Sequence, residues 1–136
     1  MTSISYSLFG GCYALNSITI GKGVTSISSD AFKFCKSLKS INISDSVVTI
    51  GMNAFDGCNS LNSVTIGKGV TTIGYNAFSS CYSLTNIYCY ANTPPELGDG
   101  VFSSNVNKTL YVPVGSSLKY KSSDWGNYFR NIIEIE

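Results

Sequence analysis

The sequence predicts a small α/β solenoid built from stacked 23-residue repeats, and three observations lead to this fold class. The segment GKGVTSI, which begins at Gly21, returns as GKGVTTI from Gly67, 46 residues later. A diverged copy, SDSVVTI, begins midway at Ser44, which sets the period at 23 residues. Each period also contains one short stretch that alternates polar and β-branched residues, as strands with one buried face do. Sequence repeats of this length are typical of stacked architectures.

The repeats come into register when the chain is divided before each Ala-Phe pair or its equivalent. At 136 residues the chain has the length of one domain. We expect a single domain, 1–136, whose parts are a partial repeat (1–7), three full repeats (8–30, 31–53 and 54–76), a divergent repeat (77–101) and a C-terminal cap (102–136). Below, each repeat is called a rung, and residues that share a position in successive rungs form a column.

Six columns are apolar in all three full repeats and form the expected core. Their members are Phe9, Phe32 and Phe55; Leu15, Leu38 and Leu61; Ile18, Ile41 and Val64; Ile20, Ile43 and Ile66; Val24, Val47 and Val70; and Ile27, Ile50 and Ile73. Burying six side chains does not offset the entropy lost when a whole repeat is ordered, so one rung cannot fold alone. Stacking supplies the missing contacts.

Each repeat is expected to contain a strand, a turn, a second extended piece and a short helical turn. The strands are the Ser-Ile-Thr-Ile segment at 17–20 and its relatives. Gly and Ser residues at 21–23 and 44–46 favour tight turns. The Val-Thr-Ser-Ile segment at 24–27 is extended. Residues able to cap a helix precede each Phe-containing pair and predict a helical turn there, namely Ser7, Asp30, Asn53 and Asn76.

The repeat pattern AFxxCxSLxxIxIxxxVxxIxxN resembles the BspA-like branch of the bacterial leucine-rich repeats over nearly the whole chain. The tail, TPP followed by VF and TLYVPVGSSLKYKSSDWGNYFRNIIEI, resembles the closing unit of such proteins from gut bacteria of the Bacteroides type. The resemblance implies a right-handed leucine-rich-repeat solenoid with a parallel sheet on one face. The chain departs from the commoner leucine-rich pattern, because Gly23, Ser46 and Gly69 stand where an asparagine ladder would run.

The two ends of the chain differ. The first nine residues superimpose on 24–32 with an offset of 23, so the chain starts within a repeat and shows no N-terminal cap. We therefore expect either more repeats upstream or self-association of two chains through this uncapped rung. The C-terminal end predicts a strand at 110–112, a segment around Trp125 that covers the core, and a last strand at 132–135.

Composition excludes several classes of partner. The net charge is +1 and only 12% of residues are charged, against a typical ~25%. Nucleic acids and anionic membranes are therefore not expected partners. No segment approaches the ~20 apolar residues of a membrane-spanning helix, so we expect no membrane insertion. The N-terminal segment also lacks signal-peptide features, which predicts either an intracellular protein or a mature fragment of a longer one.

The cysteines follow the repeat. Cys12, Cys35, Cys58 and Cys81 are spaced by 23 residues and form one column. Parallel side chains on neighbouring strands keep Cβ atoms farther apart than a disulfide prefers, and a straight column does not surround a metal ion. We interpret these thiols as small apolar core fillers, and Cys89 as a core residue too. No metal and no cofactor are expected.

Catalysis is not expected. The chain has no histidine, which excludes Ser/His/Asp and Cys/His relays and the common zinc-hydrolase motifs. The few carboxylates are scattered rather than paired. Lys22, Asp45 and Lys68 share a column and predict a weak, exposed ion-pair ladder.

The outward face of the main sheet carries the candidate partner-binding residues. One outward column contains Thr19, Asn42, Thr65 and Tyr88, and Tyr90 stands at the rim. Tyrosine combines apolar area with a polar tip and loses little entropy on binding, which suits protein or glycan contacts. The alternative interpretation is that Tyr88 and Tyr90 only cover the junction with the cap.

The resemblance implies a cell-surface or secreted bacterial protein that adheres to host matrix proteins, other bacteria or epithelium. We accordingly expect a non-enzymatic protein-interaction or adhesion module that binds a host matrix or surface protein through the sheet face and is located outside the cell. A carbohydrate-binding module with a glycan ligand is one alternative. A structural spacer without a ligand is another, and ice binding through the Ser-x-Thr columns is a third.

Overall fold

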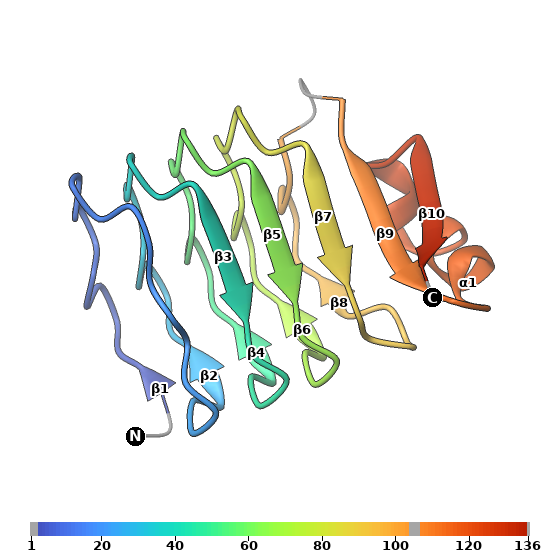
Figure 1. Cartoon of the computed structure of the whole chain (residues 1–136), viewed down its shortest axis with the longest axis horizontal. Coiled ribbons are helices and arrows are strands. Elements are labelled where there is room, and N and C mark those ends of the chain that lie inside the picture. Colours follow the sequence, from blue (N-terminus) through green and yellow to red (C-terminus); the bar gives the residue numbers. More distant parts are fainter. Residues whose placement is uncertain (1–2, 104–106, 136) are drawn as a thin grey trace.

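The structure, a computed structural model, describes residues 3–103 and 107–135. Its rungs follow one another along a single axis, with the N-terminus at one end and the C-terminus at the other (Figure 1). Two residues of the expected partial repeat, Met1 and Thr2, lie outside the described residues, as do 104–106 and Glu136 of the expected cap.

The main sheet has five parallel strands in the order β10-β9-β7-β5-β3. Their bounds are Ser40–Ile43 for β3, Ser63–Ile66 for β5, Asn86–Cys89 for β7, Thr109–Pro113 for β9 and Asn131–Ile135 for β10. Ile41, Val64, Ile87 and Leu110 lie side by side across four strands. The 23-residue period therefore continues through the divergent repeat into β9.

A second parallel sheet runs along the same axis, in the order β1-β2-β4-β6-β8. Each of its strands has two residues, with bounds Ser3–Ile4 for β1, Ser26–Ile27 for β2, Thr49–Ile50 for β4, Thr72–Ile73 for β6 and Glu96–Leu97 for β8. These strands confirm the second extended piece expected in each repeat, and their buried isoleucines face the common core.

The first rung is less regular than those that follow. Residues 17–20, expected to form a strand, form none, and within the described residues no backbone hydrogen bond joins them to β3. Phe9, Leu15 and Ile18 are half-buried, whereas the residues of the same columns in the next two rungs are buried. The physical reason is that this rung packs against a neighbour on one side only in the described chain.

The expected helical turns are absent from the described repeats, and this interpretation was wrong. Ser7, Asp30, Asn53 and Asn76 have φ of 53°, 60°, 58° and 57°, which is left-handed and not helical. Each occupies the third position of a turn closed by a backbone bond, such as that from Ala54 N–H to Gly51 O at 3.2 Å. Asp and Asn tolerate this conformation better than most residues, and a type II turn requires positive φ there.

The core is organised around a stack of phenylalanine rings. Neighbouring rings from Phe9 to Phe102 stack nearly parallel, with centroids 5.1–5.6 Å apart. At the C-terminal end the ring centroid of Phe102 lies 5.5 Å from that of Trp125 and 5.2 Å from that of Phe129. These two rings end the stack and cover it.

The covering unit contains one short α-helix and one 3-10 helix. Helix α1 spans Ser117–Lys121 and the 3-10 helix η1 spans Asp124–Asn127. Tyr120 of α1 donates its hydroxyl to Ala91 O at 2.6 Å, and the Trp125 Nε1–H donates to Pro95 O at 2.9 Å. Both anchors are buried, so they fix the unit to the divergent repeat. None of the helices in the described chain has the length and apolar character needed to cross a bilayer.

Candidate binding face

The outward face of the main sheet divides into two halves of different chemistry. Over β3 and β5 the outward residues are small and polar, namely Ser40, Asn42, Ser63 and Thr65. Over β7, β9 and β10 the column of Asn42 and Thr65 continues with Tyr88, Tyr111 and Ile133, whereas the column of Ser40 and Ser63 stays polar. We call these the polar half and the aromatic half. The inward columns do not change between them, because all are apolar and buried through β9.

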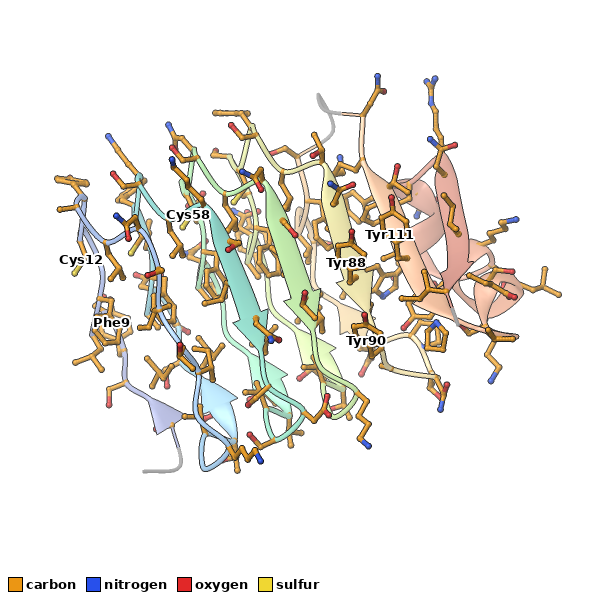
Figure 2. The ribbon with its side chains drawn as sticks, viewed as in Figure 1. Phe9, Cys12, Cys58, Tyr88, Tyr90 and Tyr111 are labelled. Atoms are coloured by element: carbon orange, nitrogen blue, oxygen red, sulfur yellow. The ribbon has the colours of Figure 1, made fainter. Side chains whose placement is uncertain are left out.

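The centre of the aromatic half is a stacked pair of tyrosines. Strand pairing sets Tyr88 beside Tyr111, and their rings stack with centroids 4.5 Å apart and planes 12° apart. Figure 2 shows the two rings side by side on the sheet, with Tyr90 just past the carboxyl end of β7. The stack covers one face of each ring, and both tyrosines are half-buried, so part of each ring remains for a partner.

An open groove of about 1150 Å³ crosses the carboxyl ends of the strands. Asn42 and Thr65 line it from the polar half, and Tyr90, Pro113 and Ile135 from the aromatic half. Tyr90 is 42% exposed, so a large part of its side chain is open to solvent at the groove. The groove therefore joins both halves of the face.

A Ser-Asp-Ser turn at 44–46 forms the middle of the groove floor and binds the rungs on both sides. Ser46 Oγ donates to Val24 O at 2.7 Å, in the preceding rung. The backbone of the following rung passes close to the turn, since a Cβ at Gly67 would lie 2.6 Å from the Ser44 carbonyl group. Glycine is therefore needed at Gly67, whereas a Cβ at Gly21, on the other side of the turn, would meet no atom within 4 Å.

The expected ion-pair ladder does not form, and this prediction was wrong. Among the described residues no ion pair joins Lys22, Asp45 and Lys68; instead the Asp45 carboxylate accepts the backbone N–H of Lys68 at 2.9 Å. A fixed amide is the better partner, because an exposed ammonium group on a flexible chain gains little from pairing. Two lysines thus line the groove beside one carboxylate already bonded to the backbone.

The cysteine column lies in the core and away from the groove. Cys35, Cys58, Cys81 and Cys89 are buried and Cys12 is half-buried, and all five are free thiols. Each of three thiols donates to the carbonyl of the phenylalanine in the preceding rung, with Cys58 Sγ 3.2 Å from Phe32 O. Burial, with a smaller effect from the neighbouring thiols, raises the pKa of Cys35 to about 12. These thiols are thus core residues, as expected, with an added hydrogen-bonding role.

Few groups on the face could carry chemistry. Within residues 3–103 and 107–135 no three Cys, Asp or Glu side chains are grouped so that they could hold a metal ion. Every buried side-chain nitrogen or oxygen in that part of the chain has a hydrogen-bond partner. What the face offers a partner is shape, aromatic edges, hydroxyls and amides.

The structure brings four of the five candidate residues onto one face. Asn42, Thr65 and Tyr88 occupy one column, and Tyr90 lies at the groove. Thr19 is exposed but lies in the segment that forms no strand. Sequence reasoning missed Tyr111 and Ile133, which complete the column. The alternation Thr-Leu-Tyr-Val at 109–112 carried the signal, because buried residues at 110 and 112 turn Tyr111 outward.

Parallel rungs of about 23 residues, a continuous core column and an open sheet face define a leucine-rich-repeat solenoid. The chain belongs to a particular branch of that class: a model of the BspA-type leucine-rich-repeat region matches residues 2–125, in 6 copies. Repeat proteins of this kind are typically structural or interaction modules. The resemblance and the fold class inferred from the sequence are both confirmed.

Solved structures with the same fold include two that are longer than this chain. A leucine-rich cell-surface protein from Faecalibacterium prausnitzii matches with a TM-score of 0.64 and 25% identity, over 90% of this chain and 32% of that one. The pneumococcal vaccine antigen PcpA matches with a TM-score of 0.62 and 18% identity, over 85% of this chain and 37% of that one. This chain therefore spans about a third of the length of each. No curated protein gives a match.

Proposed function

We propose that this chain is a non-enzymatic interaction module of a bacterial cell-surface or secreted protein, and that it binds a host matrix or surface protein through the outward face of the main sheet. The observation that carries the proposal is the aromatic half beside an open groove, on the side of the sheet that faces away from the core. Tyr88 and Tyr111 are half-buried and Tyr90 is exposed, and aromatic residues that remain accessible beside a groove are typical of interaction surfaces. The cell-surface description of the Faecalibacterium prausnitzii protein supports the location outside the cell.

Tyr90 is the residue that distinguishes a binding role of the aromatic half from a purely structural, covering role. Tyr88 stacks on Tyr111, and that contact also helps to join β7 to β9, so its presence is consistent with a covering role. Tyr90 has no stacking partner among the described aromatic pairs and is 42% exposed at the groove. A binding role predicts a dependence on Tyr90, and a covering role does not.

A glycan is the second candidate ligand. Hydroxyl and amide side chains line the groove beside Tyr90, including Ser44, Ser46 and Asn92. Planar rings next to hydrogen-bonding groups suit sugars, which present apolar faces and hydroxyl edges. Glycan binding would use the same groove and is separable by experiment.

The test is a binding screen of the purified chain against immobilised matrix proteins and a glycan array, with Tyr90→Ser and Tyr88→Ser in parallel. We expect a specific protein ligand whose binding falls at least about tenfold in Tyr90→Ser, since central aromatic residues dominate interfaces. Thermal unfolding should change little in Tyr90→Ser and modestly in Tyr88→Ser, because only the second loses a ring stack.

Each other outcome has a defined meaning. A hit on the glycan array alone would select the carbohydrate-binding module. No ligand in either screen, together with loss of stability in both variants, would contradict the proposal and leave the chain as a spacer.

A further inference from the structure

One corner of the second full repeat departs from the repeat at four positions together. The corners that precede the main-sheet segments form a row at the edge where the strands begin, and the turns that line the groove lie at the other edge (Figure 1). We call this row, residues 10–16, 33–39, 56–62 and 79–85, the amino-end ridge. No lysine or phenylalanine occurs at 10–16, 56–62 or 79–85. The corner at 33–39 has three lysines and one exposed phenylalanine, namely Lys33, Lys36, Lys39 and Phe34.

Phe34 lies on the surface in a backbone conformation that does not suit a large side chain. It occupies the third position of a turn closed by the hydrogen bond from Cys35 N–H to Phe32 O at 3.1 Å, and its φ is 62°. A bulky residue at positive φ is strained, and the ring nevertheless stays 43% exposed. Strain that does not bury the ring points to a role outside the fold. The residues at this position in the other rungs are Gly11, Gly57 and Ser80.

The rungs on both sides leave room for the Phe34 ring. In the following rung a Cβ at Gly57 would collide with Cδ1 of Phe34, so only glycine allows the ring to lie there. In the preceding rung a Cβ at Gly11 would meet no atom within 4 Å, so the surface is open at that position. The ring is therefore accessible to an apolar side chain of a partner.

Two lysines of the ridge lie over aromatic rings. Lys33 Nζ is 5.2 Å from the ring centroid of Phe34, and Lys36 Nζ is 5.2 Å from that of Tyr13. At this distance an ammonium group is attracted by the ring and keeps its three N–H donors for other bonds. Tyr13 is 59% exposed, and Lys36 and Lys39 are exposed too. The cations are thus presented at the surface.

The positive charge of the ridge is balanced only in part. Burial raises the pKa of Asp56, the ammonium group of Lys33 lowers it, and the nearby carboxylate of Asp30 raises it. Lys33 therefore already has a carboxylate close by. Within residues 3–103 and 107–135 neither Lys36 nor Lys39 forms an ion pair. Two exposed cations remain for an anionic partner.

The extent of the charge indicates which kind of anionic partner fits. It is confined to one rung, so it offers no track for a repeating polyanion such as a sulfated polysaccharide or a nucleic-acid strand. An exposed phenyl ring beside two ammonium groups matches acidic side chains next to an apolar one. The columns of Lys36 and Lys39 hold only neutral residues in the other rungs, namely Tyr13, Asn59 and Tyr82, and Asn16, Asn62 and Thr85.

We propose that the amino-end ridge binds a protein segment in which acidic residues adjoin an apolar side chain, with that side chain packed on Phe34 and the carboxylates bound by Lys36 and Lys39. A lysine ammonium is a compact charge on a flexible stem, so it can follow carboxylates without a fixed bidentate geometry. The ridge and the groove lie at opposite ends of the strands. The inference therefore does not depend on the function proposed for the sheet face.

The first test is an array of synthetic peptides that combine glutamates with one leucine or phenylalanine in varied order, probed with the full chain. Arrays with lysine in place of glutamate, or serine in place of the apolar residue, are the matched probes. We expect binding to the acidic-apolar peptides alone, weakened by added salt.

Lysine variants then locate the site. Fluorescence anisotropy gives the affinity for the best peptide, which should fall about tenfold or more in Lys36→Gln/Lys39→Gln. Lys119→Gln/Lys121→Gln removes the same charge from α1 and should bind as the unaltered chain does.

Phe34→Gly separates binding from folding. It supplies the residue that the same turn has at Gly11 and Gly57, so thermal unfolding should change little. Binding of the best peptide should fall about tenfold or more, because the apolar contact is lost.

Four outcomes would overturn the proposal. They are the absence of any bound peptide, peptide binding retained in Phe34→Gly or in Lys36→Gln/Lys39→Gln, a large loss of stability in Phe34→Gly, which would assign the ring to the fold, and tighter binding of a heparin oligosaccharide than of any peptide, which would assign the ridge to polyanionic glycans.

Discussion

The polar half and the aromatic half of the main sheet share a backbone, a period and a core, and differ only in what they turn outward. Val64 on β5 and Ile87 on β7 are equally buried and lie side by side. Their outward neighbours are Thr65 and Tyr88, one small and polar, the other aromatic. The comparison shows that the repeat constrains the inward columns for stacking and leaves the outward columns able to vary. Interaction is therefore to be sought where the outward residues depart from the repeat.

The largest expected effect is the loss of stability when an inward aromatic ring is removed. Phe55→Ala removes a ring from the middle of the phenylalanine stack, between Phe32 and Phe78. We expect a loss of about 3–5 kcal/mol in the free energy of unfolding. Thr65→Ala, the outward control in the same rung, should change it by less than about 0.5 kcal/mol. Urea unfolding measures both, and similar losses would contradict the division into inward and outward columns.

The next largest effect on stability concerns Tyr120, which anchors the covering unit to the divergent repeat. Tyr120→Phe removes the hydroxyl that donates to Ala91 O at 2.6 Å and leaves that carbonyl without this buried donor. We expect a loss of about 1–3 kcal/mol in the free energy of unfolding. Tyr128→Phe, in the same unit but half-buried, is the control. Equal and negligible losses in the two variants would show that this anchor does not hold the cap.

The thiol column predicts a pH dependence of stability. Burial first, and neighbouring thiols second, raise the pKa of Cys35 to about 12 in the folded chain, against 9.0 ordinarily. The folded state keeps its proton longer than the unfolded state does, so this contribution is complete below pH 9.0 and is lost as pH rises toward 12. Between these two pKa values one thiol lowers the free energy of unfolding by about 1.4 kcal/mol per pH unit.

Urea unfolding between pH 8 and pH 11 provides the measurement. We expect the unfolding free energy of Cys35→Ala to fall less steeply with pH than that of the unaltered chain. Identical slopes in the two proteins would show that this thiol ionises equally in both states.

The smallest effect sharpens the description of the aromatic half itself. A double-mutant cycle of Tyr88→Ser and Tyr111→Ser should give a coupling energy of about 0.5–1.5 kcal/mol, the usual value for a stacked pair. A cycle between Tyr88 and the more distant Asn42 should give nearly zero. If the first coupling were also near zero, the stack would contribute to neither stability nor rigidity of the face.

Much of the fold could be predicted from sequence because columns repeat. Leu38 and Leu61, for example, are buried as their shared position requires. The left-handed turns at Asp30 and Asn53 could not, because Asp and Asn also favour helix N-caps and the two roles share one sequence signature.

The candidate site could be predicted only in part. Tyr88 and Tyr90 belong to a recognisable repeat, whereas Tyr111 joins the column of Tyr88 only once β9 is in register. That register lies beyond the irregular stretch at 90–108, where the second sheet gains one residue and Ile73 pairs with Leu97. Ile133 joins this column only through the pairing of β10 with β9, which no local pattern encodes.

Two double variants of matched columns test whether the tyrosines of the aromatic half carry most of the binding by the outward face. Tyr88→Ser/Tyr90→Ser alters the aromatic half, and Asn42→Ser/Ser44→Ala alters the same columns on the polar half. Affinity for the ligand found in the screen is measured for both, with thermal unfolding alongside. We expect loss of binding in the first variant and retention in the second, with both chains folded. Retention in the first variant, or equal loss in both, would contradict it.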